Sequence, residues 1–359
     1  MRILILFSIL AQLLSGCNSS NKKNKTEKLS DVKEMTDDQA TVSVNEENYA
    51  LAMADMAMQR EFEQGANNTN WHHHYDIMEL DKQPAPMMNR DTKYSFSILD
   101  GGGDVAITLP ETDGRYMSLH IWNHDHVTYK VFYGPGRYVI PASVTSDYFV
   151  ANVRTQVDSK DPEDVKKSSE FQNQLKIEYL DGYQPKPFRA TKWNMDEFNK
   201  IHQKYVEIAN QQGIMGTMGT IDNPVSLEDR NRGVAIGTGL LPDKDAVYLT
   251  GKYDVNKGNK YQVTYAVPEM VNPELGFYSI TVYGDDQYLK TDMGSTLSNR
   301  DIKLNPDGKS FTITYVFQED FDNSENQLVI PTETFWINFR VYMPGQSIID
   351  GEYILPTVK

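Results

Sequence analysis

Residues 94–109 read YSFSILDGGGDVAITL, and this stretch decides the class of fold. Apolar and aromatic side chains alternate with serine in its first part, and small and apolar residues fill its last part; both patterns are typical of β-strands. The Asp-Gly-Gly-Gly-Asp sequence at 100–104 has the residues that favour a turn. The stretch therefore predicts two strands joined by a turn.

Similar short runs of strand-forming residues, bounded by residues that favour turns, follow along most of the chain. Strands so closely spaced, with few helices among them, favour a β-sandwich or a barrel-like domain. A second group of runs begins after Gly233 and predicts a second β domain. The expected strands are 94–99, 104–109, 115–122, 127–133, 137–140 and 148–154 in the first group, and 246–249, 260–267, 277–283, 310–317 and 334–342 in the second.

Three segments have the apolar spacing of helices: 46–64, 161–175 and 194–212. Ser43 and Glu46 offer a capping box at the start of the first. The third lies between the two groups of strands and is followed by Gly213, so we expect it to form a helical linker between two β domains.

The first 16 residues have the pattern of an export signal, in which Arg2 precedes an apolar run too short to span a bilayer. The sequence Leu14-Ser15-Gly16-Cys17 resembles the lipobox of bacterial lipoproteins. This resemblance implies cleavage before Cys17 and a lipid on its sulfur, so that membrane lipid becomes a partner of the protein. Because Asn18 rather than Asp follows, it also implies the outer membrane rather than the inner one in a cell that has both.

Residues 17–45 are rich in Ser, Asn, Lys and acidic residues, a composition typical of a flexible tether. The whole chain of 359 residues has 35 Lys and Arg against 50 Asp and Glu, a formal charge of −15. This charge, with no dense basic patch in the folded part, excludes nucleic acid as an expected partner. Once Cys17 carries lipid, no thiol is left for disulfides or cysteine catalysis, because it is the one cysteine.

Two sets of motifs resemble known families of domains of unknown function. The run Asn89–Ser95, then Pro110 and Gly114-Arg115-Tyr116, is similar to the family numbered 1254. The run Phe277–Tyr283, followed by Asn305–Gly308, Arg340–Tyr342 and Asp350-Gly351, is similar to its usual C-terminal partner, numbered 1214. The resemblance implies an immunoglobulin-like β-sandwich followed by a jelly-roll-like one, and it implies no particular activity.

The expected organisation follows from these patterns. It comprises a signal peptide over 1–16, a tether over 17–45, a β domain over 46–190, a helical linker over 191–232 and a second β domain over 233–359.

Histidines supply the first candidate site. His120, His124 and His126, with Trp122, occur at alternate positions, so on a strand they would share one face, and His-x-His is a spacing that two metal ligands can use. One of the adjacent histidines 72–74 and the carboxylate of Asp91 would complete the set. A divalent metal is therefore a candidate cofactor; the alternative is that these histidines are only solvated or hydrogen-bonded.

Polar residues near the start of the first strand supply the second candidate site. Asp91, paired with Arg115, is a candidate general base or ligand-binding group, and a buried structural pair is the alternative. Asn89 and Trp122 join these two as candidate ligand-binding residues, since tryptophan stacks on sugars and other flat groups where it is exposed.

Three classes of function remain open. The preferred one is a protein of the cell envelope that binds a glycan or another small ligand at a cleft in or between the β domains. The alternatives are a metal-assisted or carboxylate-based hydrolase and a structural or assembly protein, for which a homo-oligomer is expected. The sequence has no Gly-x-Ser-x-Gly, His-Glu-x-x-His or dinucleotide-binding motif.

Overall fold

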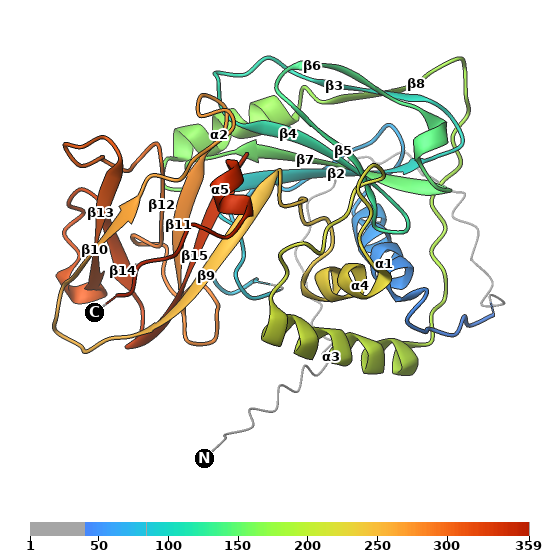
Figure 1. The fold of residues 1–359 in the computed structure, drawn as a ribbon. Helices are drawn as coiled ribbons and strands as arrows, with labels where there is room; N and C mark the ends of the chain where they lie inside the picture. The colour runs from blue at the N-terminus through green and yellow to red at the C-terminus, as the bar shows by residue number, and fades with distance from the viewer. Residues whose placement is uncertain (1–39, 84, 359) are drawn as a thin grey trace, which may run out of the picture. The chain divides into compact units, whose positions relative to one another are not determined.

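Antiparallel β-sheets dominate the computed structural model, which describes residues 40–83 and 85–358 (Figure 1). The expectation of a mainly β protein with a few helices is confirmed, and the structure is consistent with two β domains. The predicted signal peptide, Cys17 and most of the tether lie outside the described residues.

The N-terminal half is a sandwich of a five-stranded and a three-stranded sheet. Apolar side chains from both sheets form its core, including Leu99, Ile107, Leu119 and Val153. The five-stranded sheet has the spatial order β1 (His72–His73), β2 (Thr92–Asp100), β7 (Tyr148–Gln156), β4 (Met117–Asn123) and β5 (Thr128–Tyr133); the three-stranded sheet has the order β6 (Gly136–Ile140), β3 (Val105–Leu109) and β8 (Lys176–Tyr179).

The glycine-rich turn at 101–103 carries the chain from the first sheet to the second. A Cβ atom on Gly101 would lie 1.8 Å from the carbonyl oxygen of Ser146, and one on Gly103 would lie 2.4 Å from the ring of Tyr183. Only glycine fits at such close approaches, because a Cβ atom would overlap its neighbour.

The C-terminal half is a second sandwich, with a core that includes Ile280, Phe311, Tyr315 and Phe339. One of its strand pairs, β13 with β14, is parallel, and the other pairs are antiparallel. Its sheets have the orders β12 (Thr296–Ser298), β11 (Tyr278–Gly284), β15 (Thr334–Tyr342), β9 (Ala246–Asp254), and β10 (Tyr261–Ala266), β13 (Ser310–Phe317), β14 (Gln327–Ile330).

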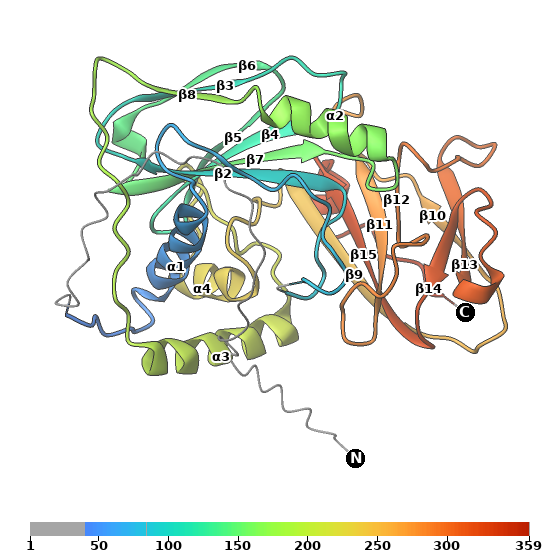
Figure 2. The ribbon, with the colours of Figure 1, turned by 180° about the vertical axis from the view of Figure 1, so that it is seen from behind.

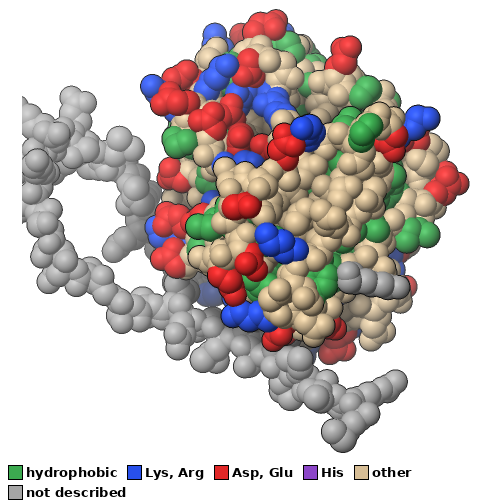
Figure 3. Space-filling model, turned by 90° about the vertical axis from the view of Figure 1, so that its left-hand side faces the viewer, with side chains coloured by type: hydrophobic (Ala, Val, Ile, Leu, Met, Phe, Trp, Pro, Cys, Tyr) green, Lys and Arg blue, Asp and Glu red, His purple; other side chains and the backbone are tan. Residues whose placement is uncertain are grey.

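The surface of the C-terminal sandwich is mixed in charge. Figure 3 shows acidic and basic side chains interspersed around a broad area without charge. Gln262 and Thr264 of β10 are exposed, and the hydroxyl of Thr264 lies 2.9 Å from that of Thr312 on β13.

Three helices pack together on the side of the free face of the five-stranded sheet; the first lies directly against the sheet, and the expected linker helix packs on the other two as an outer layer (Figures 1 and 2). The expected linker helix is one of them, so it packs against the N-terminal half as well as leading to the C-terminal half. The three are α1 (Tyr49–Glu63), α3 (Met195–Gln212) and α4 (Leu227–Ile236); the remaining helices are α2 (Pro162–Gln172) and α5 (Gln346–Ile349), with 3₁₀ turns at Ala142–Val144 and Gln318–Asp320.

The capping box expected at Ser43 and Glu46 is not formed. The first helix begins only at Tyr49, after Asn48. Ser43 Oγ donates to Glu197, and Glu46 accepts from Lys204, so both residues tie the entering chain to α3 instead.

The free face of the five-stranded sheet is buried yet partly polar. Strand alternation turns every second residue of β2, β7 and β4 toward the helices. Three rungs of side chains cross this face: Tyr94, Arg154 and Ser118; Phe96, Asn152 and His120; and Ile98, Val150 and Trp122.

Asp91 joins the two sandwiches. Its carboxylate accepts from Ser279 Oγ at 2.5 Å and Thr296 Oγ1 at 3.0 Å, and it lies 3.7 Å from Nη1 of the buried Arg340. Arg340 also donates to the hydroxyl of Tyr283 at 2.7 Å. Residues 40–359 therefore form one compact unit, in which a buried ion pair and its hydrogen bonds cross from one sandwich to the other.

Among the described residues, no helix has the length and apolar character needed to cross a bilayer.

Replacing Asp91 by alanine is predicted to lower the free energy of unfolding by about 3 kcal/mol or more, because it leaves the buried Arg340 without its carboxylate. The exposed ion pair of Asp286 with Lys290 supplies the control, and Asp286→Ala is expected to cost less than about 1 kcal/mol. Urea unfolding measures both. Equal losses in the two variants would contradict the structural role of Asp91.

Candidate metal centre

The predicted histidine strand ends before two of its histidines. Strand β4 stops at Asn123, and a turn follows in which His126 has a φ of 58°. His120 and Trp122 therefore share a face as expected, but His124 and His126 are not on the strand. The shared face predicted for all four residues is wrong, because the turn redirects the chain.

Each of these three histidines has a different partner. His120 Nε2 lies 2.9 Å from Thr128 Oγ1, His124 donates to Asp55 at 2.8 Å, and His126 Nε2 accepts from the backbone N–H of Gly239 at 2.7 Å. Within the described ranges, these three histidines do not bring three ligand atoms close enough together for one ion.

The expected pair of Asp91 with Arg115 is also absent from the described part of the chain. Arg115 pairs with Asp113 at 2.8 Å and with Asp164 at 2.6 Å, at the start of α2. Asp91 instead joins the sandwiches, as described above. Asn89 donates to Tyr342 near this joint, whereas Trp122 lies under α1, so the four candidate ligand-binding residues do not share one site.

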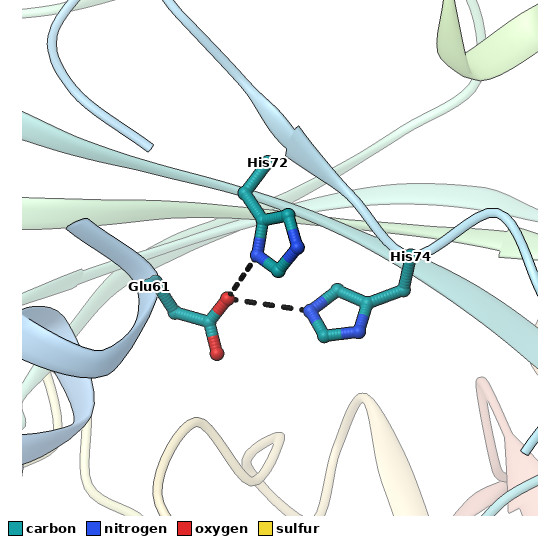
Figure 4. A group of neighbouring side chains, drawn as sticks. All are labelled: Glu61, His72 and His74. Atoms are coloured by element: carbon teal, nitrogen blue, oxygen red, sulfur yellow. Dashed lines mark hydrogen bonds and ion pairs between the residues drawn. The ribbon is translucent and has the colours of Figure 1, made fainter. Parts of the chain in front are cut away.

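Two histidines and a glutamate meet elsewhere, at the edge of the five-stranded sheet (Figure 4). Glu61 Oε2 lies 2.7 Å from His72 Nδ1 and 3.3 Å from His74 Nε2. Glu61 is only 4% exposed, while both histidines are partly exposed. We call these three residues the edge cluster.

Backbone pairing places the edge cluster. His72 pairs with Phe96 and His73 with Ser95, which fixes the register of the short strand β1 on β2. Alternation then turns His72 and His74 to the face covered by α1, and the ring of His73 to Ser95 Oγ at 2.8 Å. Glu61, in the last turn of α1, meets the two rings from the other side.

The electrostatics of the edge cluster favour an ionised carboxylate. Burial by itself would raise the pKa of Glu61, but hydrogen bonds from His74 and His72, together with the charge of Arg60, lower it to about 2. A buried carboxylate beside two imidazoles is a set of ligands that zinc and related divalent ions accept.

The distances suit such an ion. The three ligand atoms lie within 4.8 Å of one another. In tetrahedral zinc with bonds of about 2.0–2.2 Å, ligand atoms are roughly 3.3 Å apart, so small side-chain rotations are sufficient. Three protein ligands leave at least one position open for another molecule.

A small cavity adjoins the edge cluster. Its volume of about 30 Å³ is enough for one or two water molecules. The walls are mostly apolar, and Glu61 is part of them. The lining residues are Ala57, Met58, Arg60 and Glu61 of α1, Phe96, Ile98, Trp122 and Val150 of the sheet, and Thr238.

Part of this site was predicted from the sequence. One of His72, His73 and His74 was expected to contribute a third metal ligand, but to a different group of histidines. Glu61 was not expected at all, since it is one of two glutamates near the end of a helix. Its one distinguishing signal is its spacing from Met58 and Ala54, which places it on the buried face of α1.

Comparison with known proteins supports the C-terminal half of the expectation. Residues 245–346 match the family described as "Protein of unknown function (DUF1214)". No curated protein matches the chain.

Two solved structures are similar over most of the chain. The VPA0106 protein from Vibrio parahaemolyticus shares 20% identity at a TM-score of 0.66, covering 88% of this chain and 98% of that one. A putative uncharacterized protein from Burkholderia cenocepacia shares 13% identity at a TM-score of 0.51, covering 87% of each chain. At these identities the likeness concerns the fold alone.

The buried His126 makes a testable contribution to acid stability. Burial lowers its pKa to about 4, against about 6.5 in an unfolded chain. Between these pH values the unfolded chain binds a proton that the folded protein does not, so stability is complete above pH 6.5 and falls as the pH drops toward 4. The loss is about 3 kcal/mol by pH 4.

We therefore expect His126→Asn, which tolerates a positive φ, to flatten the pH dependence of the free energy of unfolding over this window. Asp125→Asn, at the exposed neighbouring position, is the control. Urea unfolding at a series of pH values measures the difference, and identical slopes for His126→Asn and the native protein would refute the assignment.

Proposed function

We propose that this chain is an exported lipoprotein, held on the cell envelope through acylated Cys17, that binds a small ligand through a divalent metal at the edge cluster. The observation that carries the proposal is the meeting of Glu61, His72 and His74 next to a cavity. The lipobox at residues 14–17 supports the membrane anchor, and Asn18 supports the outer membrane. The motifs around Asn89 and Arg115 support a family 1254 domain in the N-terminal half.

The cavity favours one kind of ligand. A metal with an open position binds an oxygen, nitrogen or sulfur donor, and the apolar walls formed by Met58, Ile98 and Val150 suit a short apolar group beside that donor. A glycan is less well matched, because sugar sites rely on stacking and hydroxyl partners. Of the Phe, Trp and Tyr side chains in the described residues, only Tyr75 is largely exposed to solvent.

A metal-assisted hydrolase is the second candidate. Two histidines and one carboxylate are a ligand set of catalytic zinc sites, in which the open position holds a water molecule whose pKa is lowered. The chemistry at that position, binding or hydrolysis, separates the two candidates.

Metal content tests the proposal. We expect the full-length protein, dialysed against zinc or manganese and then against buffer, to retain about one equivalent of metal by mass spectrometry. Glu61→Gln and His72→Ala should retain less than about a tenth as much, because each removes one of three ligands. His73→Ala is the matched control, since this neighbouring ring points to Ser95. Native protein without metal, or equal metal in Glu61→Gln, would reject the site.

The anchor has its own test. Two or three acyl chains hold a protein on a membrane essentially permanently. We expect Cys17→Ser to abolish incorporation of labelled palmitate and to move the protein from the detergent phase to the aqueous phase on phase separation. Unchanged labelling of the Cys17→Ser variant would exclude the lipobox.

A further inference from the structure

The buried face of the five-stranded sheet holds several polar atoms without partners. His120 Nδ1, Trp122 Nε1, Asn152 Oδ1 and Arg154 Nη1 are all buried and make no hydrogen bond among the described residues. In native proteins more than about nine in ten buried polar atoms are paired, so each exception requires a partner such as water, an ion or a ligand. Here four exceptions come from two adjacent strands.

Arg154 is the strongest of these exceptions, because it is charged. It is 4% exposed, and its one acceptor is the carbonyl oxygen of Gly239, bonded to Nη2. The buried Arg115 and Arg340 each have a carboxylate within 4.0 Å, but Arg154 has none in the described part of the chain. Burying a guanidinium without a carboxylate partner carries a large desolvation cost, which an anion would offset.

The other groups around Arg154 do not supply that anion. Its guanidinium lies over the ring of Tyr94, 5.4 Å from the centroid. Asp245 is buried nearby; its Oδ1 accepts from the hydroxyl of Tyr133, and its Oδ2 makes no hydrogen bond among the described residues. Burial raises the pKa of Asp245 and the charge of Arg154 partly offsets this rise, without an ion pair between the two in that part of the chain. Arg154 therefore faces aromatic rings and a single backbone carbonyl.

The segment 237–241 covers these polar atoms. Gly239 has a φ of 70°, and a Cβ atom on it would lie 3.3 Å from Asn152 Nδ2 and 3.4 Å from Trp122 Nε1. Leu240 and Leu241 of the segment line a small hollow with Met215, Met218 and Tyr248. The segment therefore borders both unpaired polar atoms and incompletely filled space, which lowers the cost of displacing it.

We propose that the segment 237–241 covers a binding site for a small oxyanion, a carboxylate or phosphate, that takes the place of the Gly239 carbonyl on Arg154. Arg154 Nη1 and Nη2 and Trp122 Nε1 are its donors, and the unpaired Asn152 Oδ1, an acceptor, is not among them. The site needs no metal and uses none of the three metal ligands, although Trp122 and Thr238 also line the cavity beside Glu61.

Calorimetric titration of the full-length protein with inorganic phosphate and with acetate, at constant ionic strength set by chloride, tests this site. We expect saturable binding of at least one anion, and the one that binds identifies the ligand class. Arg154→Met should weaken it at least tenfold and should still fold, because no carboxylate loses a partner. Trp122→Phe, which keeps the ring but not the N–H, should weaken it about three- to tenfold.

Two controls distinguish this site from others. Arg137→Met removes an exposed arginine that pairs with Glu178, and it should leave anion binding unchanged. Glu61→Gln should also leave it unchanged, even if it abolishes metal binding. No saturable binding by the native protein, equal binding by Arg154→Met and Trp122→Phe, or loss of binding in Glu61→Gln would each overturn the proposal.

Discussion

Both faces of the five-stranded sheet are buried, but one is apolar and the other is partly polar. The rest of the structure follows from this constraint. One face packs Leu119, Ile121 and Val153 against the three-stranded sheet as an ordinary apolar core. The other face carries His120, Asn152 and Arg154 on its central strands, so an apolar cover alone would leave charges and polar atoms unpaired. Helix α1 and the segment 237–241 lie over it, and the Gly239 carbonyl accepts from Arg154, whereas His120 Nδ1, Asn152 Oδ1 and Arg154 Nη1 have no partner among the described residues.

This arrangement explains where the chemistry lies. Strand β1 is the edge strand of the five-stranded sheet and is only two residues long. His72 and the adjacent His74 therefore lie at the sheet edge, where both are partly exposed to solvent. The helix that covers the sheet ends at the same edge, and it brings the buried Glu61 to both rings. The buried charges of Asp91, Arg115 and Arg340 have structural partners, two of them at the joint between the sandwiches.

Strand alternation and helical spacing predicted most of the fold. The expected strands 310–317 and 334–342 coincide with β13 and β15, and the expected helix 194–212 differs from α3 by one residue. Strands β1, β8, β12 and β14 were missed because each is only two to four residues long. The match of residues 245–346 agrees with the motifs read in the C-terminal half.

The partners of the buried charges were harder to predict because their contacts are distant in sequence. Asp91 and its partner Ser279 are 188 residues apart, and Arg115 and Asp164 are 49 apart, so no local pattern relates them. The histidine pattern at 120–126 failed for a local reason: His-x-His gives a shared face only while a strand continues, and β4 ends at Asn123. The pair His72 and His74 has the same spacing, and there the pairing of β1 with β2 and the hydrogen bond from the His74 N–H to the Tyr94 carbonyl keep both rings on one face.

Anomalous X-ray diffraction at the zinc absorption edge, from crystals of the zinc-loaded protein, tests the central claim most directly. The account predicts one strong peak within about 2.0–2.3 Å of the Glu61 carboxylate, His72 Nδ1 and His74 Nε2. A map without a peak there, in which both imidazoles still donate to Glu61, would contradict it.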